Sequence, residues 1–317
     1  DTIPIAKTIP YIKNIHIFSY QKKHDNRWRQ EIDIVFNIIK KYDLSINLTA
    51  SDRSVIYSLI AAKKSISAIE NDPFKSWWKK LLLNHYYYFD KSKHILLNNL
   101  KSLDFLNITF ENINYPFDPS NEAKLNVKKK LESKLINDFL IFHPSAQYEY
   151  KIYPRHLRDI LLASLNTLGV SILVTGGTSP IDQAIKRQIP KLKNVFNFIG
   201  ETSIEEFVAL SKLSLGYIGM DTLNMHIAAS QSKQIFAIFG PTNLKMWSPW
   251  SNVMSISATQ NFPKQRYSNI TIFQADMECV ACGKEGCEGN GKSICLDHIN
   301  PKMVSIEVQK WLDEEIS

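Results

Sequence analysis

Five short apolar runs in the second half of the chain alternate with segments of helical periodicity. The runs cover residues 139–142, 170–174, 195–199, 215–218 and 235–239. Regular alternation of strands and helices predicts an α/β domain in which a parallel sheet carries helices on both faces. Few other architectures accommodate this pattern, so it limits the fold more than any other feature.

Each predicted strand ends at small, polar or turn-forming residues. These residues are Ser145, Gly176–Gly177, Gly200, Asp221–Thr222 and Gly240–Thr242. Ligands of open parallel sheets bind beyond the carboxyl ends of the strands, so we expect a phosphate or ribose site there. Thr222 begins a predicted helix whose first backbone N–H groups could hold an anion. The alternative is ordinary turn chemistry, which also favours Gly, Ser and Thr.

The first part of the chain has a less regular α/β pattern. Helical spacing covers residues 27–42 and 54–62, and strand patterns cover residues 43–48 and 65–69. A proline-punctuated break at Tyr115–Ser120 marks the expected boundary between domains. At roughly 150 residues per domain, 317 residues suggest two domains, which we place at residues 1–118 and 119–317.

The composition is that of a folded globular chain. Hydrophobic residues make up 44% and charged residues 22%, which excludes disordered, collagen-like and coiled-coil chains. No apolar run approaches the ~20 residues of a membrane-spanning helix. The 38 Lys and Arg against 31 Asp and Glu give a net charge of +7. This charge favours anionic partners such as phosphates, nucleic acid or an acidic membrane surface, with a generally lysine-rich composition as the alternative.

Three motifs of other α/β enzymes are absent from the sequence. The chain contains no G-x-G-x-x-G, no G-x-S-x-G and no Asp-x-Asp pair. Dinucleotide-dependent oxidoreductases, α/β-hydrolases and metal-clamped nucleotide-sugar sites are therefore disfavoured.

Two groups of segments resemble glycosyltransferase family nine, the bacterial heptosyltransferases of the lipopolysaccharide inner core. The first group is Phe142–Ala146 followed by Lys151–Pro154, which is similar to the family's H-P-G-A and K-x-W-P. The second is Gly219–Ala229 followed by Phe239–Thr242 and Trp247–Pro249, which is similar to D-[ST]-G-x-x-H-x-A-A, F-G-P-T and W-x-P. The likeness covers residues 138–305 well and the first part of the chain loosely.

The resemblance implies a GT-B fold, in which two Rossmann-like domains with parallel sheets face a cleft. The second domain would bind ADP-heptose, and the enzyme would transfer heptose to the inner core with inversion and without a catalytic cofactor. Lys151 would contact the donor phosphates, Asp182 the ribose hydroxyls, and His226 would lie on the ligand side of its helix. The alternative for His226 is a purely structural histidine, whose hydrogen bonds are made within the domain. The donor-binding residues implied by the motifs are Ser145, Lys151, Asp182, Asp221, Thr222, His226 and Thr242.

The sequence departs from the family pattern in three places. Leu223 stands where the family has Gly, and Tyr153 stands where it has Trp. The family's S-x-x-G-D segment, whose Asp is the proposed general base, has no counterpart in this sequence. We therefore expect the first domain to lack its leading strand and loop, and we assign no catalytic residue. A non-catalytic homologue that binds sugar nucleotide is the alternative function.

Two features of the first domain bear on the acceptor and on location. Arg53 matches the family's small-x-R-S and would bind acceptor phosphates or carboxylates, with a solvated helix start as the alternative. The stretch Trp77–Lys80 suits either a membrane surface or core packing with snorkelling lysines, and we expect core packing. The resemblance implies a cytoplasmic enzyme, peripheral to the inner membrane, with no nucleic-acid partner.

All four cysteines lie in one short segment near the end of the chain. Cys279, Cys282, Cys287 and Cys295 have the spacing C-x2-C-x4-C-x7-C. Four thiolates in one loop suit tetrahedral zinc, so we expect a structural zinc site, with a local crosslink as the alternative. A zinc knuckle in a basic chain would also suit a nucleic-acid-binding protein. The acidic residues of this segment argue against that reading.

Overall fold

The computed structural model describes residues 3–19, 23–109 and 117–316. Contacts divide the chain into two compact units, one of residues 12–111 and a larger one of residues 112–317 together with residues 1–11. Residues 1–11 join the larger unit because helix α1 (Ile3–Lys7) packs on α9 (Ile204–Leu213) and Ile5 enters its core. The expected break at Tyr115–Ser120 lies partly outside the described residues, and the limits 1–118 and 119–317 stay a prediction.

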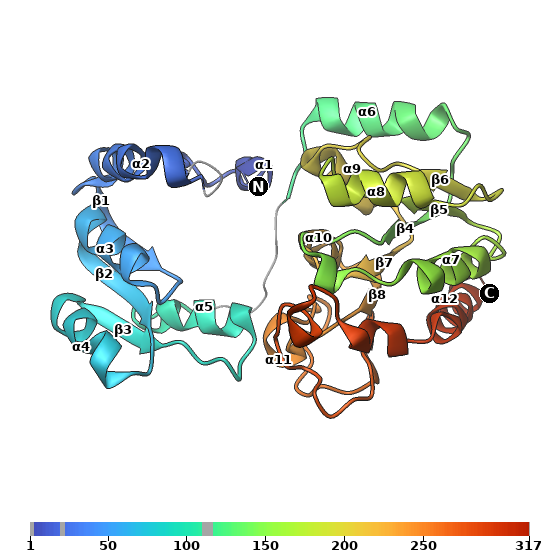
Figure 1. The fold of residues 1–317 in the computed structure, drawn as a ribbon. Helices are drawn as coiled ribbons and strands as arrows, with labels where there is room; N and C mark the ends of the chain where they lie inside the picture. The colour runs from blue at the N-terminus through green and yellow to red at the C-terminus, as the bar shows by residue number, and fades with distance from the viewer. Residues whose placement is uncertain (1–2, 20–22, 110–116, 317) are drawn as a thin grey trace. The chain divides into compact units, whose positions relative to one another are not determined.

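The larger unit is built on a seven-stranded sheet in the order β6-β5-β4-β7-β8-β10-β9 (Figure 1). Its strands pair in parallel, except that β9 runs antiparallel to β10. The predicted parallel sheet is confirmed, and β9 and β10 add two strands that the sequence pattern did not indicate. The strands are β4 (Phe139–His143), β5 (Ser171–Val174), β6 (Val195–Asn197), β7 (Gly216–Met220), β8 (Gln234–Ile238), β9 (Lys264–Tyr267) and β10 (Ile270–Phe273).

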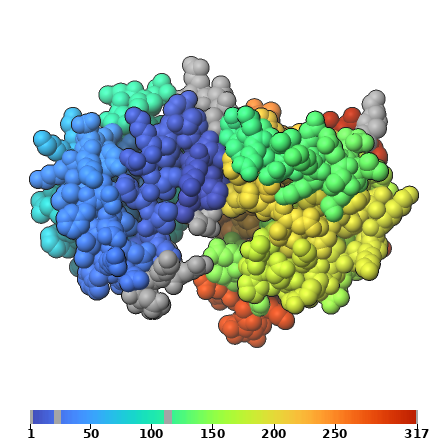
Figure 2. Space-filling view, turned by 90° about the horizontal axis from the view of Figure 1, so that it is seen from above, coloured from blue at the N-terminus to red at the C-terminus, as the bar shows by residue number. Residues whose placement is uncertain are grey.

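Helices cover both faces of this sheet, as expected for strands that are apolar on both sides. Ile141 of β4 packs with α6, α9 and α10 on one face, whereas Leu140 and Phe142 pack with α7, α8 and α12 on the other. Helix α6, in green, lies on the outside of the unit (Figure 2). Besides α1 and α9, the described part of this unit contains the helices α6 (Asn121–Glu132), α7 (Arg155–Leu165), α8 (Pro180–Gln188), α10 (Leu223–Ser230), α11 (Leu244–Trp247) and α12 (Pro301–Ile316), with the 3-10 turns η1 (Glu149–Lys151), η2 (Cys287–Gly289) and η3 (Ile294–His298).

The strand order reverses beside β4. The chain leaves β4 outward through β5 and β6 and then returns to place β7 on the other side of β4. The carboxyl ends of β4 and β7 therefore form the topological switch point, where open parallel sheets bind their ligands. Ser145 and Lys151 follow β4, and Asp221 and Thr222 follow β7.

The smaller unit is a three-stranded parallel sheet in the order β1-β2-β3. Its central strand is the most deeply buried, with Ile66, Ala68 and Ile69 almost fully covered. The strands predicted at residues 43–48 and 65–69 agree with β1 and β2. The elements are α2 (Lys23–Ile38), β1 (Tyr42–Asn47), α3 (Asp52–Ala61), β2 (Ala62–Ile69), α4 (Pro73–Leu82), β3 (His85–Tyr88) and α5 (Ile95–Asp104).

Helix α2 forms as the apolar spacing predicts, but most of the apolar side chains in that pattern face solvent. Trp28 and Phe36 are 78% and 72% exposed, and Ile32 is exposed as well. The residues that reach the core are Ile34 and Ile38, which pack beside Ala61 of α3.

The expectation of core packing with snorkelling lysines for Trp77–Lys80, which lie in helix α4, is wrong for most of this stretch. Trp77 is 63% exposed, and Trp78 alone packs partly against the small core around Val55 and Ile69. Lys79 does not snorkel, because its ammonium is buried between the carboxylates of Asp52 and Glu70. The carboxylates that pair with Lys79 lie elsewhere in the chain, and they decide which side of the helix turns inward.

Candidate functional site

An ion pair joins the two strand ends at the switch point of the larger unit. Lys151 ends the turn η1, and its Nζ lies 2.7 Å from Oδ2 of Asp221, the residue after β7. The Lys151 and Asp221 side chains are 24% and 8% exposed. The structure thus brings together two of the predicted donor-binding residues and leaves part of the Lys151 side chain accessible.

Helix α10 begins directly after this ion pair. Thr222 is its N-cap residue, but the Thr222 side chain accepts no hydrogen bond from the helix backbone. The Thr222 hydroxyl instead lies 3.4 Å from the hydroxyl of Tyr217. A helix start without a side-chain cap leaves its first N–H groups for water or for an anion. Leu223, which stands at the family's Gly position, is the first residue of the helix.

His226 lies in the first turn of α10, within electrostatic reach of the ion pair. Burial lowers the pKa of the His226 imidazole, Asp221 opposes this shift, and Lys151 adds to it. The half-buried ring is therefore neutral near pH 7. A neutral imidazole offers one N–H donor and one nitrogen acceptor.

Ser145 and Asp182 form a second polar pair at the end of β4. The Ser145 hydroxyl donates to one oxygen of Asp182, and Ser179 donates to the other through its hydroxyl and its backbone N–H. Asp182 and Ser179 also form the capping box of α8. Burial would raise the pKa of Asp182, but hydrogen bonds from Ser145, Ser179 and the Gly177 backbone lower it below its usual value. Asp182 anchors Ser145 and the start of α8 in this structure, and its ribose contact stays a prediction.

His143, the last residue of β4, is a buried histidine that was not among the predicted site residues. The Nδ1 atom of His143 is 2.9 Å from Oγ1 of Thr175 and 3.2 Å from Nδ2 of Asn224. Burial lowers the pKa of His143 to about 4, and Asp182 offsets only part of this shift. The neutral ring links the ends of β4 and β5 to α10. Its place directly after the predicted strand at residues 139–142 was the available signal.

The loop that contains Thr242 is fastened by a glutamine after β10. Nε2 of Gln274 donates to the carbonyl oxygens of Gly240 and Thr242, each at 3.0 Å. Gln274 is 2% exposed. Because β10 was not predicted, nothing in the sequence connected Gln274 to this loop. A contact between Thr242 and a donor stays a prediction.

Arg53 lies in the first turn of α3, in the smaller unit. Its Nη1 is 3.5 Å from Oε1 of Glu31, and its guanidinium carbon is 4.2 Å from the ring centre of Phe18. The helix start is capped by the Ser51 hydroxyl, which accepts from the Ser54 N–H. Arg53 is thus oriented within its own unit, and its role toward an acceptor stays a prediction.

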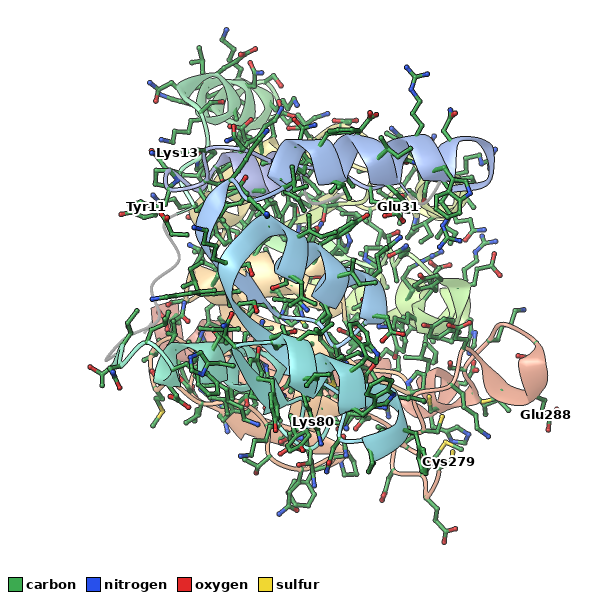
Figure 3. All side chains as sticks on the ribbon, turned by 90° about the vertical axis from the view of Figure 1, so that its left-hand side faces the viewer. Tyr11, Lys13, Glu31, Lys80, Cys279 and Glu288 are labelled. Carbon is green, nitrogen blue, oxygen red and sulfur yellow. The ribbon has the colours of Figure 1, made fainter. Side chains whose placement is uncertain are left out.

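The four cysteines are free thiols in the irregular segment after β10. Burial, together with the nearby charges of Cys287, Cys282 and Cys279, raises the pKa of Cys295 to about 11. Figure 3 shows sulfur atoms beside the labelled Cys279. Within the described ranges, no three His, Cys, Asp or Glu side chains are placed to share a metal ion. The donor set suits zinc, and zinc binding stays a prediction.

The same segment contains a match to the pattern G-x-x-x-x-G-K-S at Gly286–Ser293. A phosphate-binding loop of this type connects a strand to a helix. Residues 286–293 instead span η2 and lead into η3, within the cysteine segment. The local structure therefore excludes this reading of the pattern.

Two α/β units with parallel sheets are the architecture of the GT-B class of glycosyltransferases. The sequence profile of glycosyltransferase family 9 (heptosyltransferase) matches residues 38–273. That range covers most of the chain. The chain therefore belongs to glycosyltransferase family 9, the heptosyltransferases, whose members act in lipopolysaccharide core synthesis.

Three relatives illustrate the likeness. Lipopolysaccharide heptosyltransferase 3 of Escherichia coli (strain K12) is 25% identical over 266 residues, which are 79% of this chain and 74% of the relative. A family 9 glycosyltransferase from Veillonella parvula DSM 2008 has a TM-score of 0.73 at 18% identity, over 96% of this chain and 85% of the other. ADP-heptose lipopolysaccharide heptosyltransferase II of E. coli has a TM-score of 0.68 at 16% identity, over 100% of this chain and 88% of the other.

Proposed function

We propose that this chain transfers heptose from ADP-heptose to the lipopolysaccharide inner core, with inversion at the anomeric carbon. The observation that carries the proposal is the Lys151–Asp221 ion pair beside the start of α10. A partly exposed lysine side chain next to the first backbone N–H groups of a helix suits a diphosphate. The E. coli relative named for ADP-heptose supports the choice of donor.

Each residue of the site has a role in this proposal. Lys151 and the first N–H groups of α10 bind the diphosphate, and Asp221 holds the Lys151 ammonium in place. His226 meets the donor as a neutral hydrogen-bonding group. Ser145 and Thr242 line the site from their strand-end loops, and Arg53 of the smaller unit binds anionic groups of the acceptor.

The proposed reaction is a single displacement. An acceptor hydroxyl oxygen forms a bond to the anomeric carbon while the bond from that carbon to the diphosphate oxygen breaks. The hydroxyl proton leaves to a general base. The negative charge that grows on the diphosphate is stabilised by the Lys151 ammonium and by the N–H groups of α10.

The location follows from the acceptor in this proposal. A lipopolysaccharide acceptor is anchored in a membrane, so the enzyme works at the cytoplasmic face of the inner membrane. Among the described residues, no helix has the length and hydropathy needed to cross a bilayer. Attachment at the surface is therefore the form of association that we propose.

Calorimetry with ADP-heptose tests the donor site, and mass spectrometry of a heptose-free core acceptor tests transfer. We expect binding by the wild-type chain and a mass gain of one heptose on the acceptor. Lys151→Ala should weaken donor binding by about 10–100-fold, because a charge-assisted contact to phosphate is lost.

The matched control is Lys128→Ala, since Lys128 is an exposed lysine of the same unit. This variant should bind ADP-heptose as the wild type does. Equal donor binding by Lys151→Ala and the wild type would overturn the phosphate assignment. Donor binding without any transfer would instead favour the non-catalytic homologue.

A further inference from the structure

Helix α4 of the smaller unit turns its polar side inward and its apolar side toward solvent. Ser76 and Lys79 are completely buried, at 0% exposure. Phe74, Trp77 and Leu81 are 90%, 63% and 75% exposed. The spacing of three and then four residues places these large side chains on one face of the helix. A helix on the surface of a soluble unit normally has the opposite arrangement.

The buried polar side fixes the orientation of α4. The Nζ atom of Lys79 lies 2.7 Å from Oδ1 of Asp52, 2.6 Å from Oε2 of Glu70 and 2.7 Å from the carbonyl oxygen of Ala50. The hydroxyl of Ser76 donates to the Glu70 carbonyl oxygen at 2.7 Å. Rotating the apolar side inward would separate a buried ammonium from two carboxylates, which is strongly unfavourable. The apolar face is therefore held outward.

The charge around this face is positive. Lys75 and Lys80 flank it on α4, and Figure 3 labels Lys80 on this helix. The helix itself contains no acidic residue, and its N-cap residue Asp72 has Oδ2 3.9 Å from the Lys75 ammonium. Residues 12–111 contain 16 Lys and Arg against 10 Asp and Glu, whereas the rest of the chain contains 22 against 21. Nearly all of the net positive charge thus belongs to the unit that presents the apolar face.

We propose that Phe74, Trp77 and Leu81, together with the exposed Leu82, dock the smaller unit on a bilayer surface that contains anionic lipids. Apolar side chains of such a helix enter the boundary between headgroups and acyl chains, and tryptophan favours that boundary. Lysines beside them pair with lipid phosphates. The net positive charge suits this occupant and opposes contact with a second copy of the same unit. The inference extends the proposed function, which places the acceptor at a membrane.

Vesicle sedimentation with the full chain tests the proposal. The probes are vesicles of phosphatidylethanolamine with phosphatidylglycerol, and vesicles of phosphatidylcholine alone. We expect the chain to bind the anionic vesicles, and to bind the neutral ones at least about tenfold less tightly. The reason is that each lysine near an anionic surface adds electrostatic attraction. The triple variant Phe74→Ser, Trp77→Ser, Leu81→Ser should bind the anionic vesicles at least about tenfold less tightly, since it lacks the inserting side chains.

The matched control is a triple variant on the larger unit, Leu135→Ser, Leu213→Ser, Ile306→Ser, whose side chains are 90%, 56% and 63% exposed. It should bind anionic vesicles as the wild type does. Both triple variants should keep the wild-type circular dichroism spectrum and ADP affinity, so a failure of the donor site is distinguishable from a failure of docking. Equal vesicle binding by the α4 variant and the wild type would overturn the proposal. So would a wild-type chain that ignores vesicles and forms a dimer that the α4 variant does not form.

Discussion

The Nζ atom of Lys151 lies 2.7 Å from Oδ2 of Asp221, although 70 residues of chain separate the two. The contact connects the segment after β4 with the segment after β7, the two strands that flank the reversal of the sheet. It also places a cation beside the start of α10. The pair therefore links the stability of the strand-end loops to the geometry of the proposed donor site.

A double-mutant cycle should measure this link. Lys151→Met and Asp221→Asn should each lower the free energy of unfolding, and the double variant should lose about 1–3 kcal/mol less than the sum, because a mostly buried pair is broken only once. Urea unfolding at neutral pH provides the measurement. The exposed pair Lys128–Glu132, at 3.7 Å, is the control and should couple by no more than about 0.5 kcal/mol. Strictly additive effects at Lys151 and Asp221 would refute the link.

Asp182→Asn should destabilise the larger unit by about 2–4 kcal/mol at pH 7, because the amide replaces an acceptor of several buried hydrogen bonds and disrupts the capping box. The folded-state pKa of Asp182 is lowered, so its ionised form contributes stability above its usual pKa, and this contribution is lost as the pH falls through the lower folded value. The difference between wild type and variant in urea unfolding should therefore shrink between pH 7 and pH 3. Asp118→Asn, at an exposed ion pair with Lys124, should change stability little at either pH. A difference that grows toward acid would contradict the assignment.

His143 should make the stability of the chain fall as the pH is lowered from 6.5 to 4. The pKa of His143 is about 4 in the folded chain, against an ordinary value of 6.5. Between these two pH values the imidazole is mostly protonated in the unfolded chain and mostly neutral in the folded chain. Linkage then predicts a loss of roughly 3 kcal/mol at pH 4 relative to neutral pH. His143→Asn should be less stable at pH 7 but should show a flatter profile. Urea unfolding across the window decides, and equal slopes for variant and wild type would exclude His143 as the source.

We propose that the four cysteines hold one structural zinc ion, with free thiolates as the donors. Metal analysis of the purified chain should find about one zinc per chain, and chelation should lower the melting temperature by about 5 °C or more, because metal binding stabilises the folded state. Cys282→Ser should lose the zinc and melt at the temperature of the chelated wild type. Zinc-free protein with four intact thiols would contradict the proposal, and mass loss from oxidation would point to crosslinks instead.

The predictable part of this protein is local. The apolar runs located β4, β5, β6, β7 and β8, and the small polar residues after them marked the carboxyl ends of these strands. Each of these signals lies within a few residues of the feature that it indicates. The short strand β10 (Ile-Thr-Ile-Phe) was not predicted, because four residues with three apolar side chains do not distinguish a strand from a buried turn of helix. Because β10 was not predicted, the hydrogen bonds from Gln274 to the loop at Gly240 and Thr242 could not be predicted either.

What the sequence alone determined is therefore the α/β class, the strand ends and the family motifs, because hydrophobic periodicity and turn chemistry depend on neighbours along the chain. Only the tertiary structure placed β7 beside β4, and with it Asp221 beside Lys151. Only the tertiary structure, too, turned Lys79 inward and Trp77 outward. An amphipathic pattern shows that a helix has two sides, but the partners that fold against it decide which side is buried.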